Sequence, residues 1–174
     1  AFTGFLTYLS TEEQLRSITF WSMGSLGGAS WKTVMAMLPF ALIPLIVLLF
    51  LSKQLNGLAL GESQALHMGI RVSRLKKLII VLTTMAVGAS VAVAGIIGFI
   101  GLVIPHIIRI ACSADNRIVI PASSLLGAIV LVLADTMART IVSPAELPIG
   151  ILTAIIGTPA FIFILLKQRR QRFM

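Results

Sequence analysis

Long uncharged stretches constrain this chain more than any other feature of its sequence. Residues 33–52, 78–108, 118–134 and 147–166 contain no Asp, Glu, Lys or Arg. A hydrocarbon layer of about 30 Å is crossed by about 20 apolar residues of helix. The composition agrees, because only 11% of the residues are charged, against about 25% in soluble domains. We therefore predict an all-α, polytopic transmembrane helical bundle that forms a single domain.

The stretch at 78–108 is too long for one ordinary span. It contains 31 residues, among them Gly95, Gly98, Gly101 and Pro105. We expect a full span that ends near Ala94, a glycine-rich turn and a second, shorter helix. The chain then has about five spans, preceded by the stub of an earlier one at residues 1–9. The predicted spans are 33–52, 75–97, 99–113, 118–138 and 147–166.

The distribution of charge also favours five spans. Eleven basic residues then face the cytoplasm, and only Arg16, Lys32 and Arg139 face outward, as the positive-inside rule requires. One long helix over 78–108 would instead place the basic C-terminal tail outside. We therefore expect a cytoplasmic C-terminus. Since the chain opens on Ala1 without a basic segment before an apolar one, we expect no signal peptide and a start partway through a longer protein.

The inner loop at 53–74 is too long for a tight turn and too polar to span a membrane. Between Gly61 and Gly69 its pattern favours a short amphipathic helix that carries Ala65, Leu66 and Met68. Such a helix either lies in the lipid headgroups or docks into a partner protein. The residues alone leave both interpretations open.

A few polar residues lie within or beside the apolar stretches. His106 and Arg109 share one helix face and either anchor a helix end or line a path. Asp135 and Arg139 are spaced to form an ion pair, for which a structural role is favoured over a proton relay. Pro159 should kink the last span.

Several classes of function are excluded by what the sequence lacks. It contains no Gly-Lys-Ser/Thr of a P-loop, no G-x-S-x-G and no H-E-x-x-H. The single Cys112 excludes a multi-cysteine metal site. The net charge of +8 arises from basic residues between apolar runs, and not from a nucleic-acid surface. We expect a protein that is not an enzyme and that binds no metal, cofactor or nucleic acid.

Five motifs, in this order, resemble the FecCD family of permease subunits of bacterial ABC importers. The resemblance covers nearly the whole chain, although family members are about twice as long and have ten spans. This chain is similar to the C-terminal half. The motifs are W-S-M-G-S-L (21–26) with Trp31, L-A-L-G-E-S-Q-A-L-H-M-G (58–69), G-F-I-G-L-V-I-P-H-I-I-R (98–109), A-D-x-x-A-R (134–139), and L-P-I-G (147–150) with G-T-P-x-F (157–161).

The resemblance implies roles for particular residues. The loop would hold a coupling helix that docks into an ATPase subunit, and Arg16 would contribute to docking of a periplasmic binding protein. The implied coupling residues are Leu60, Gly61, Glu62, Ala65 and Gly69. The implied path or structural residues are Gly98, Gly101, Pro105, His106, Arg109, Pro159 and Phe161.

The resemblance also implies partners and a location. A second permease copy, two ATPase subunits that bind ATP and Mg²⁺, and a periplasmic binding protein would assemble in the lipid of the bacterial inner membrane. The substrate is expected to be haem first, a ferric siderophore second and cobalamin third. Two rivals remain: an electron-transfer subunit with His67 and His106 as haem ligands, and an ion-coupled secondary transporter that uses Asp135 and Arg139.

Overall fold

The structure is a computed structural model, and it describes residues 10–141 and 148–172. The predicted stub at 1–9 therefore lies outside the described residues. Within them all regular structure is helical, which confirms the all-α prediction. The helices are α2 (Glu12–Met23), α3 (Trp31–Phe50), α4 (Ser52–Ala59), α5 (Glu62–His67), α6 (Val72–Ala94), α7 (Ile100–Ala111), α8 (Asn116–Ile141) and α9 (Ile149–Arg172).

Three helices are long and apolar enough to cross a membrane. They are α3, α6 and α8, with 20, 23 and 26 residues, or about 30–39 Å at 1.5 Å per residue. The other two apolar segments are shorter. Helix α7 has 12 residues, about 18 Å, and the apolar part of α9 is Ile149–Ile162. The uncharged stretch at 78–108 is indeed divided, because α6 ends at Ala94 and α7 begins at Ile100.

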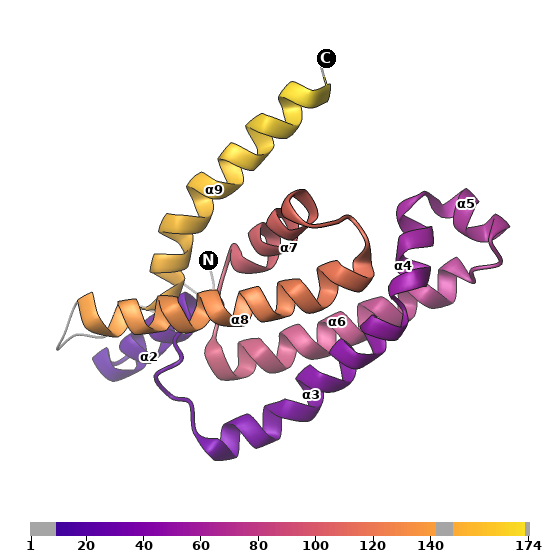
Figure 1. The fold of residues 1–174 in the computed structure, drawn as a ribbon. Coiled ribbons are helices and arrows are strands. Elements are labelled where there is room, and N and C mark those ends of the chain that lie inside the picture. The colour runs from indigo at the N-terminus through magenta and orange to yellow at the C-terminus, as the bar shows by residue number, and fades with distance from the viewer. Residues whose placement is uncertain (1–9, 142–147, 173–174) are drawn as a thin grey trace.

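The helices form one bundle with two distinct ends (Figure 1). Helix α3 packs against α6 and α8, and α7 packs against α8 and α9. Helices α4 and α5 lie together at one end, beside the turn that joins α7 to α8. At the other end α2 meets α9, which then leads away from the three long helices. The inner loop of the sequence and the glycine-rich turn thus lie at opposite ends of the bundle.

Few apolar side chains of the long helices are buried. In the most apolar part of α3 only 6% of the residues are buried, and the same is true of α6. Contact of such a large apolar surface with water would be strongly unfavourable, whereas lipid or another protein subunit can cover it. A small buried cluster of Ala134, Ala138 and Ile149 joins the end of α8 to the start of α9.

Three glycines let backbones meet at the end of the bundle that holds α2. The amide of Ser25 donates to the carbonyl of Ala94 at 2.9 Å, and the amide of Ile149 donates to the carbonyl of Gly24 at 3.1 Å. Gly24 and Gly95 adopt positive φ, +73° and +69°, a conformation that favours glycine. A Cβ on Gly95 or Gly150 would overlap a backbone carbonyl of α2. Gly24, Gly95 and Gly150 together form what we call the glycine junction.

Candidate functional site

Helices α4 and α5 form a hairpin that projects from the end of the bundle (Figure 1). The connection from α3 is short, since α3 ends at Phe50 and α4 begins at Ser52. The sequence predicts the second helix of this hairpin but not the first. We refer to residues 52–69 as the α4–α5 hairpin.

Glycines terminate α5 on both sides. Gly61 lies immediately before the helix at φ +112°, and Gly69 follows it at φ +77°. Side chains with a Cβ rarely adopt these values, and neither glycine has another atom near the position of a Cβ. Their role is therefore conformational. They turn the chain sharply into and out of a helix of only six residues.

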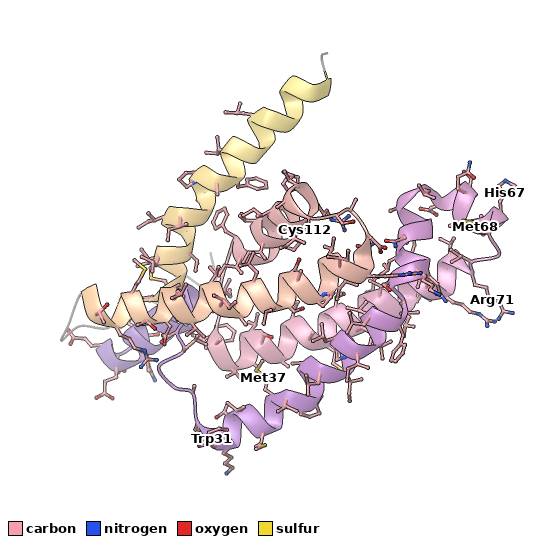
Figure 2. The ribbon with its side chains drawn as sticks, in the orientation of Figure 1. Trp31, Met37, His67, Met68, Arg71 and Cys112 are labelled. Atoms are coloured by element: carbon pink, nitrogen blue, oxygen red, sulfur yellow. The ribbon has the colours of Figure 1, made fainter. Side chains whose placement is uncertain are left out.

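One face of α5 is anchored and the other is open. Ala65 is fully buried, and its carbonyl accepts a hydrogen bond from the amide of Ile70 at 3.0 Å. Leu60, Leu66 and Met68 are instead 70%, 61% and 55% exposed. Figure 2 shows Met68 and His67 at this extremity of the molecule. Three apolar side chains around one exposed helix favour contact with a partner surface or with the membrane interface.

An ion pair joins α5 to α6. The ammonium of Lys76 donates to a carboxylate oxygen of Glu62, and both side chains are substantially exposed. An exposed ion pair contributes at most about 1 kcal/mol to stability. Glu62 therefore has two separable properties, a charge on the outer surface of α5 and a contact that holds α5 to α6.

A second polar contact joins the hairpin to the turn between α7 and α8. The side-chain nitrogen of Asn56 donates to Asp115 Oδ1 at 2.6 Å. The side-chain oxygen of Asn56 accepts from the backbone and side-chain nitrogens of Asn116 at 2.9 Å and 2.8 Å. Arg109 donates in turn to Asn116 Oδ1 at 2.9 Å. We call these four residues the asparagine clamp.

Hydrogen bonds also stabilise the charged form of Asp115. The backbone amide of Arg117 donates to Asp115 Oδ1 at 2.9 Å. This hydrogen bond lowers the pKa of Asp115 below its ordinary value of 3.8, and the bond from Asn56 lowers the pKa further. The clamp therefore contains a carboxylate at neutral pH.

No motif of the sequence singles out Asn56, Asp115 or Asn116. The run Ser-Ala-Asp-Asn between two apolar stretches is typical of a helix start, and Asp115 does cap α8 in this way. Its partner could not be predicted, because Asn56 lies 59 residues earlier in the chain.

The predicted path residues are divided between two elements and a turn. Gly98 lies between α6 and α7, Gly101 and Pro105 lie in α7, and Pro159 and Phe161 lie in α9. Helix α7 packs against α9. An apolar cavity of about 200 Å³ lies between α7, α8 and α9, and its lining includes Phe99, Gly157 and Ala160.

The two polar residues of α7 have different surroundings. Arg109 belongs to the asparagine clamp, which fits the interpretation that it anchors a helix end. His106 is half-buried, and its side chain makes no hydrogen bond within the described part of the chain. Gly98 and Gly101 have no atom near the position of a Cβ. The close backbone approaches are made instead by Gly95 and Gly150, and Gly157 packs against Phe99 of the turn.

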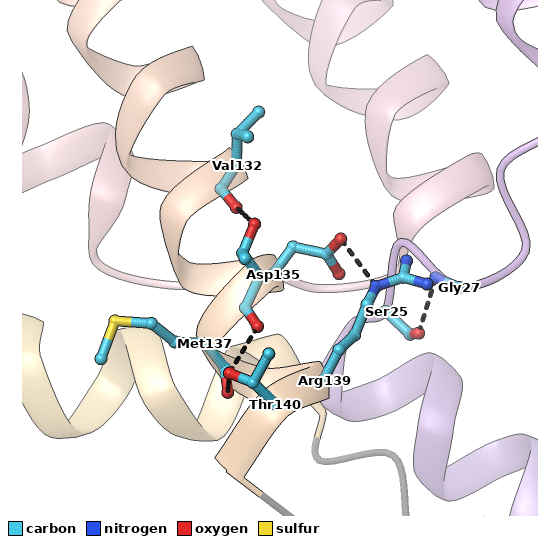
Figure 3. A network of polar contacts seen from close by, with 8 residues as sticks. Ser25, Gly27, Val132, Asp135, Met137, Arg139 and Thr140 are labelled. Carbon is cyan, nitrogen blue, oxygen red and sulfur yellow. Dashed lines mark hydrogen bonds and ion pairs between the residues drawn. The ribbon is translucent and has the colours of Figure 1, made fainter. Parts of the chain in front are cut away.

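At the far end of α8, Arg139 Nε donates to Asp135 Oδ2 at 2.9 Å. Figure 3 shows this ion pair beside the turn in which the amide of Gly27 donates to Ser25 Oγ. Leu26 of the same turn packs against the buried cluster at the end of α8. Arg16 lies in α2, but its side chain is not among those that the structure describes. No group of three or more metal-ligating side chains occurs in residues 10–141 and 148–172.

The fold and the site define a polytopic helical membrane protein with a helical hairpin at one end. The chain belongs to the FecCD transport family, whose model matches residues 1–167. This confirms the resemblance of the sequence motifs and classes the chain with transport proteins and not with enzymes.

Three similar proteins illustrate the relationship. The hemin transport system permease protein HmuU of Yersinia pestis is 46% identical over 172 residues, which are 99% of this chain and 52% of HmuU. The vitamin B12 import system permease protein BtuC of Salmonella schwarzengrund is 47% identical over 164 residues, which are 94% of this chain and 50% of BtuC. A solved structure described as an inward-facing metal-chelate type ABC transporter has a TM-score of 0.86 at 39% identity, over 94% of this chain and 53% of that one. The chain thus spans about half the length of these relatives.

Proposed function

We propose that this chain is part of the permease subunit of an ABC importer. The permease moves an iron complex or a related metal chelate from the periplasm to the cytoplasm across the bacterial inner membrane. This proposal is supported by the names of its relatives, which are permeases for hemin and vitamin B12 and a metal-chelate type ABC transporter. ATP hydrolysis belongs to a separate subunit, which the membership of the chain in the FecCD transport family supports.

The observation that carries the proposal is the α4–α5 hairpin. Helix α5 and the residues that flank it expose Leu60, Leu66 and Met68 at the end of a membrane bundle, and a partner protein would cover these apolar side chains. An ATPase subunit at the cytoplasmic face would supply that surface. Gly61 and Gly69 would then fix the angle at which α5 meets the partner.

The assembly proposed here has two permease copies, two ATPase subunits and a periplasmic binding protein. Exposed apolar surfaces on α3, α6 and α8 provide faces for lipid and for the second copy. Helix α2 lies at the opposite end of the bundle from the hairpin, where Arg16 would meet the binding protein. Residues of α7 and α9 would line part of the path.

Haem remains the favoured substrate, before ferric siderophores and cobalamin, although the identities to HmuU and BtuC are nearly equal.

Co-purification with the ATPase subunit tests the proposal, with Glu62→Lys as the informative variant. Wild-type permease should retain the ATPase in detergent, and Glu62→Lys should reduce the retained fraction at least several-fold. Because Glu62 also pairs with Lys76, the double variant Glu62→Lys/Lys76→Glu restores that ion pair with its charges reversed. If the surface charge of α5 contacts the ATPase, the double variant should stay defective.

Glu12→Lys on α2 is the matched control, since it reverses an exposed charge at the opposite end of the bundle. It should bind the ATPase as wild type does. Absence of association in the wild type would overturn the importer proposal. Recovery in the double variant would show instead that Glu62 acts only through Lys76. Uptake of haem, a ferric siderophore and cobalamin by a strain that lacks the permease gene would then rank the substrates.

A further inference from the structure

The asparagine clamp is the polar connection between the hairpin and α8. The side-chain amide of Asn56 makes three of its four possible hydrogen bonds in this contact: its nitrogen donates once and its oxygen accepts twice, at 2.6–2.9 Å. Asn116 is only 8% exposed and bonds to Asn56 on one side and to Arg109 on the other. Separation of the hairpin from α8 would break all three of these hydrogen bonds together.

The hairpin is built so that α4 and α5 move together. Gly57 of α4 is buried, and a Cβ at this position would lie 2.6 Å from Ile70 Cδ1 and 2.7 Å from Met68 Cε. The missing side chain lets the segment after α5 lie directly on α4. Ala65 is buried in the same region. A displacement of α5 must therefore be passed to α4.

On the other side of the clamp lies the part of the bundle proposed to contain the path. Asp115 and Asn116 begin α8, which packs against α3, α7 and α9. Arg109 extends the connection to the last turn of α7. The clamp thus ties the start of α8 and the end of α7 to one residue of α4.

We propose that the asparagine clamp transmits movement of the α4–α5 hairpin to α7 and α8, with Asn56 as the positioning residue. This inference rests on the proposed function, in which α5 contacts the ATPase. Tight polar contacts of this kind behave as discrete, made or broken arrangements and so can carry a rigid-body displacement. A complex without the clamp should still assemble and hydrolyse ATP, but hydrolysis should no longer drive import.

The test measures import and ATP hydrolysis by the reconstituted permease–ATPase complex in proteoliposomes. Asn56→Ala removes three hydrogen bonds, and Asp115→Ala removes two. Both variants should raise the number of ATP molecules hydrolysed per substrate imported at least ten-fold. The double variant Asn56→Ala/Asp115→Ala should hydrolyse no more ATP per substrate imported than Asn56→Ala alone, because the two residues act through one contact.

Two further variants separate coupling from general stability. Asp115→Asn keeps an oxygen that accepts from both Asn56 and Arg117, so it should retain coupling within about two-fold. Gln54→Ala is the control, because Gln54 lies two residues from Asn56 in the same helix and is exposed. Its side chain makes no hydrogen bond in the described part of the chain, so this variant should behave as wild type. All measurements use complexes that co-purify intact. If Asn56→Ala does not assemble, the comparison of Asp115→Ala with Asp115→Asn decides the question.

The outcomes distinguish this inference from the proposed function. A wild-type complex that neither binds the ATPase nor imports would overturn the proposed function, and the clamp inference with it. The clamp inference alone would be overturned if the wild-type complex imports substrate and Asn56→Ala and Asp115→Ala hydrolyse the same amount of ATP per substrate imported as the wild type. Uncoupling by Asp115→Asn equal to that by Asp115→Ala would also overturn it, since a hydrogen bond from Asn56 would then not be the property that matters.

Discussion

At the scale of single residues, the glycine junction depends on the lack of a Cβ atom in glycine. The carbonyl of Met23 occupies the place that a Cβ on Gly150 would take, and the carbonyl of Trp21 does the same at Gly95. Backbone atoms cannot rotate away from such an overlap as a side chain can. The approach of α2 to the ends of α6 and α9 is therefore possible only with glycine at these positions.

Gly150→Ala should accordingly destabilise the protein by about 3 kcal/mol or prevent its accumulation in the membrane. Gly127→Ala is the matched control, because Gly127 lies inside α8 with no atom within 4 Å of the position of a Cβ, and alanine favours helix by about 1 kcal/mol. Thermal unfolding of the two purified variants in detergent compares them directly. Equal melting temperatures would show that the backbones at the junction separate at little cost.

The sequence reveals many glycines but not which of them are closely packed. Gly98 and Gly101 belong to a family motif and lie in open surroundings, whereas Gly24 and Gly150 meet carbonyls of distant segments. Asn56 presents the same difficulty, because its partners are 59 and 60 residues away. The sequence shows which residues are small or polar. Which residues they contact depends on the tertiary arrangement of distant segments.

At the scale of elements, helix ends are determined by short local signals. Helix α3 begins after Ser30, whose hydroxyl oxygen accepts from the amide of Thr33 at 3.2 Å. Helix α6 ends before Gly95, as the glycine-rich turn of the sequence predicts. The sequence does not predict helix α4, because nearly all of its residues belong to the polar loop at 53–74. The helix has an amphipathic pattern of its own, but eight residues are too few to be stable alone, and contacts with α5 and α8 stabilise it.

The cap of α3 provides a test at this scale. Ser30→Ala removes an acceptor for the first turn and should cost about 1 kcal/mol, or about 2–4 °C in melting temperature for a domain of this size. Ser124→Ala is the control, since its hydroxyl bonds only to the carbonyl of Ile120 in its own helix, and it should change the melting temperature much less. An effect at Ser124 as large as that at Ser30 would contradict the capping role.

At the scale of the whole molecule, the two ends of the bundle differ in charge. Near the hairpin lie Arg71, Arg74 and Lys76. Arg109 belongs to the asparagine clamp, and Arg117 lies beside it. Lys32 and Arg139 lie at the end that holds α2. Anionic lipid and the positive-inside rule favour the more basic end in the cytoplasm. Sequence and fold therefore support the same proposed orientation, and the hairpin then faces the compartment that contains ATP.

Cys112 provides a direct test of this orientation, because it is exposed at the end of α7 beside the clamp. In spheroplasts that carry the protein with Cys112 as its sole cysteine, a membrane-impermeant maleimide should label it only after permeabilisation, with at least a ten-fold difference. Lys32→Cys in a Cys112→Ser background should be labelled without permeabilisation, since residue 32 is exposed at the start of α3. The reverse pattern would place the hairpin outside the cell, where no ATPase could reach α5, and it would exclude ATP-driven coupling through this surface.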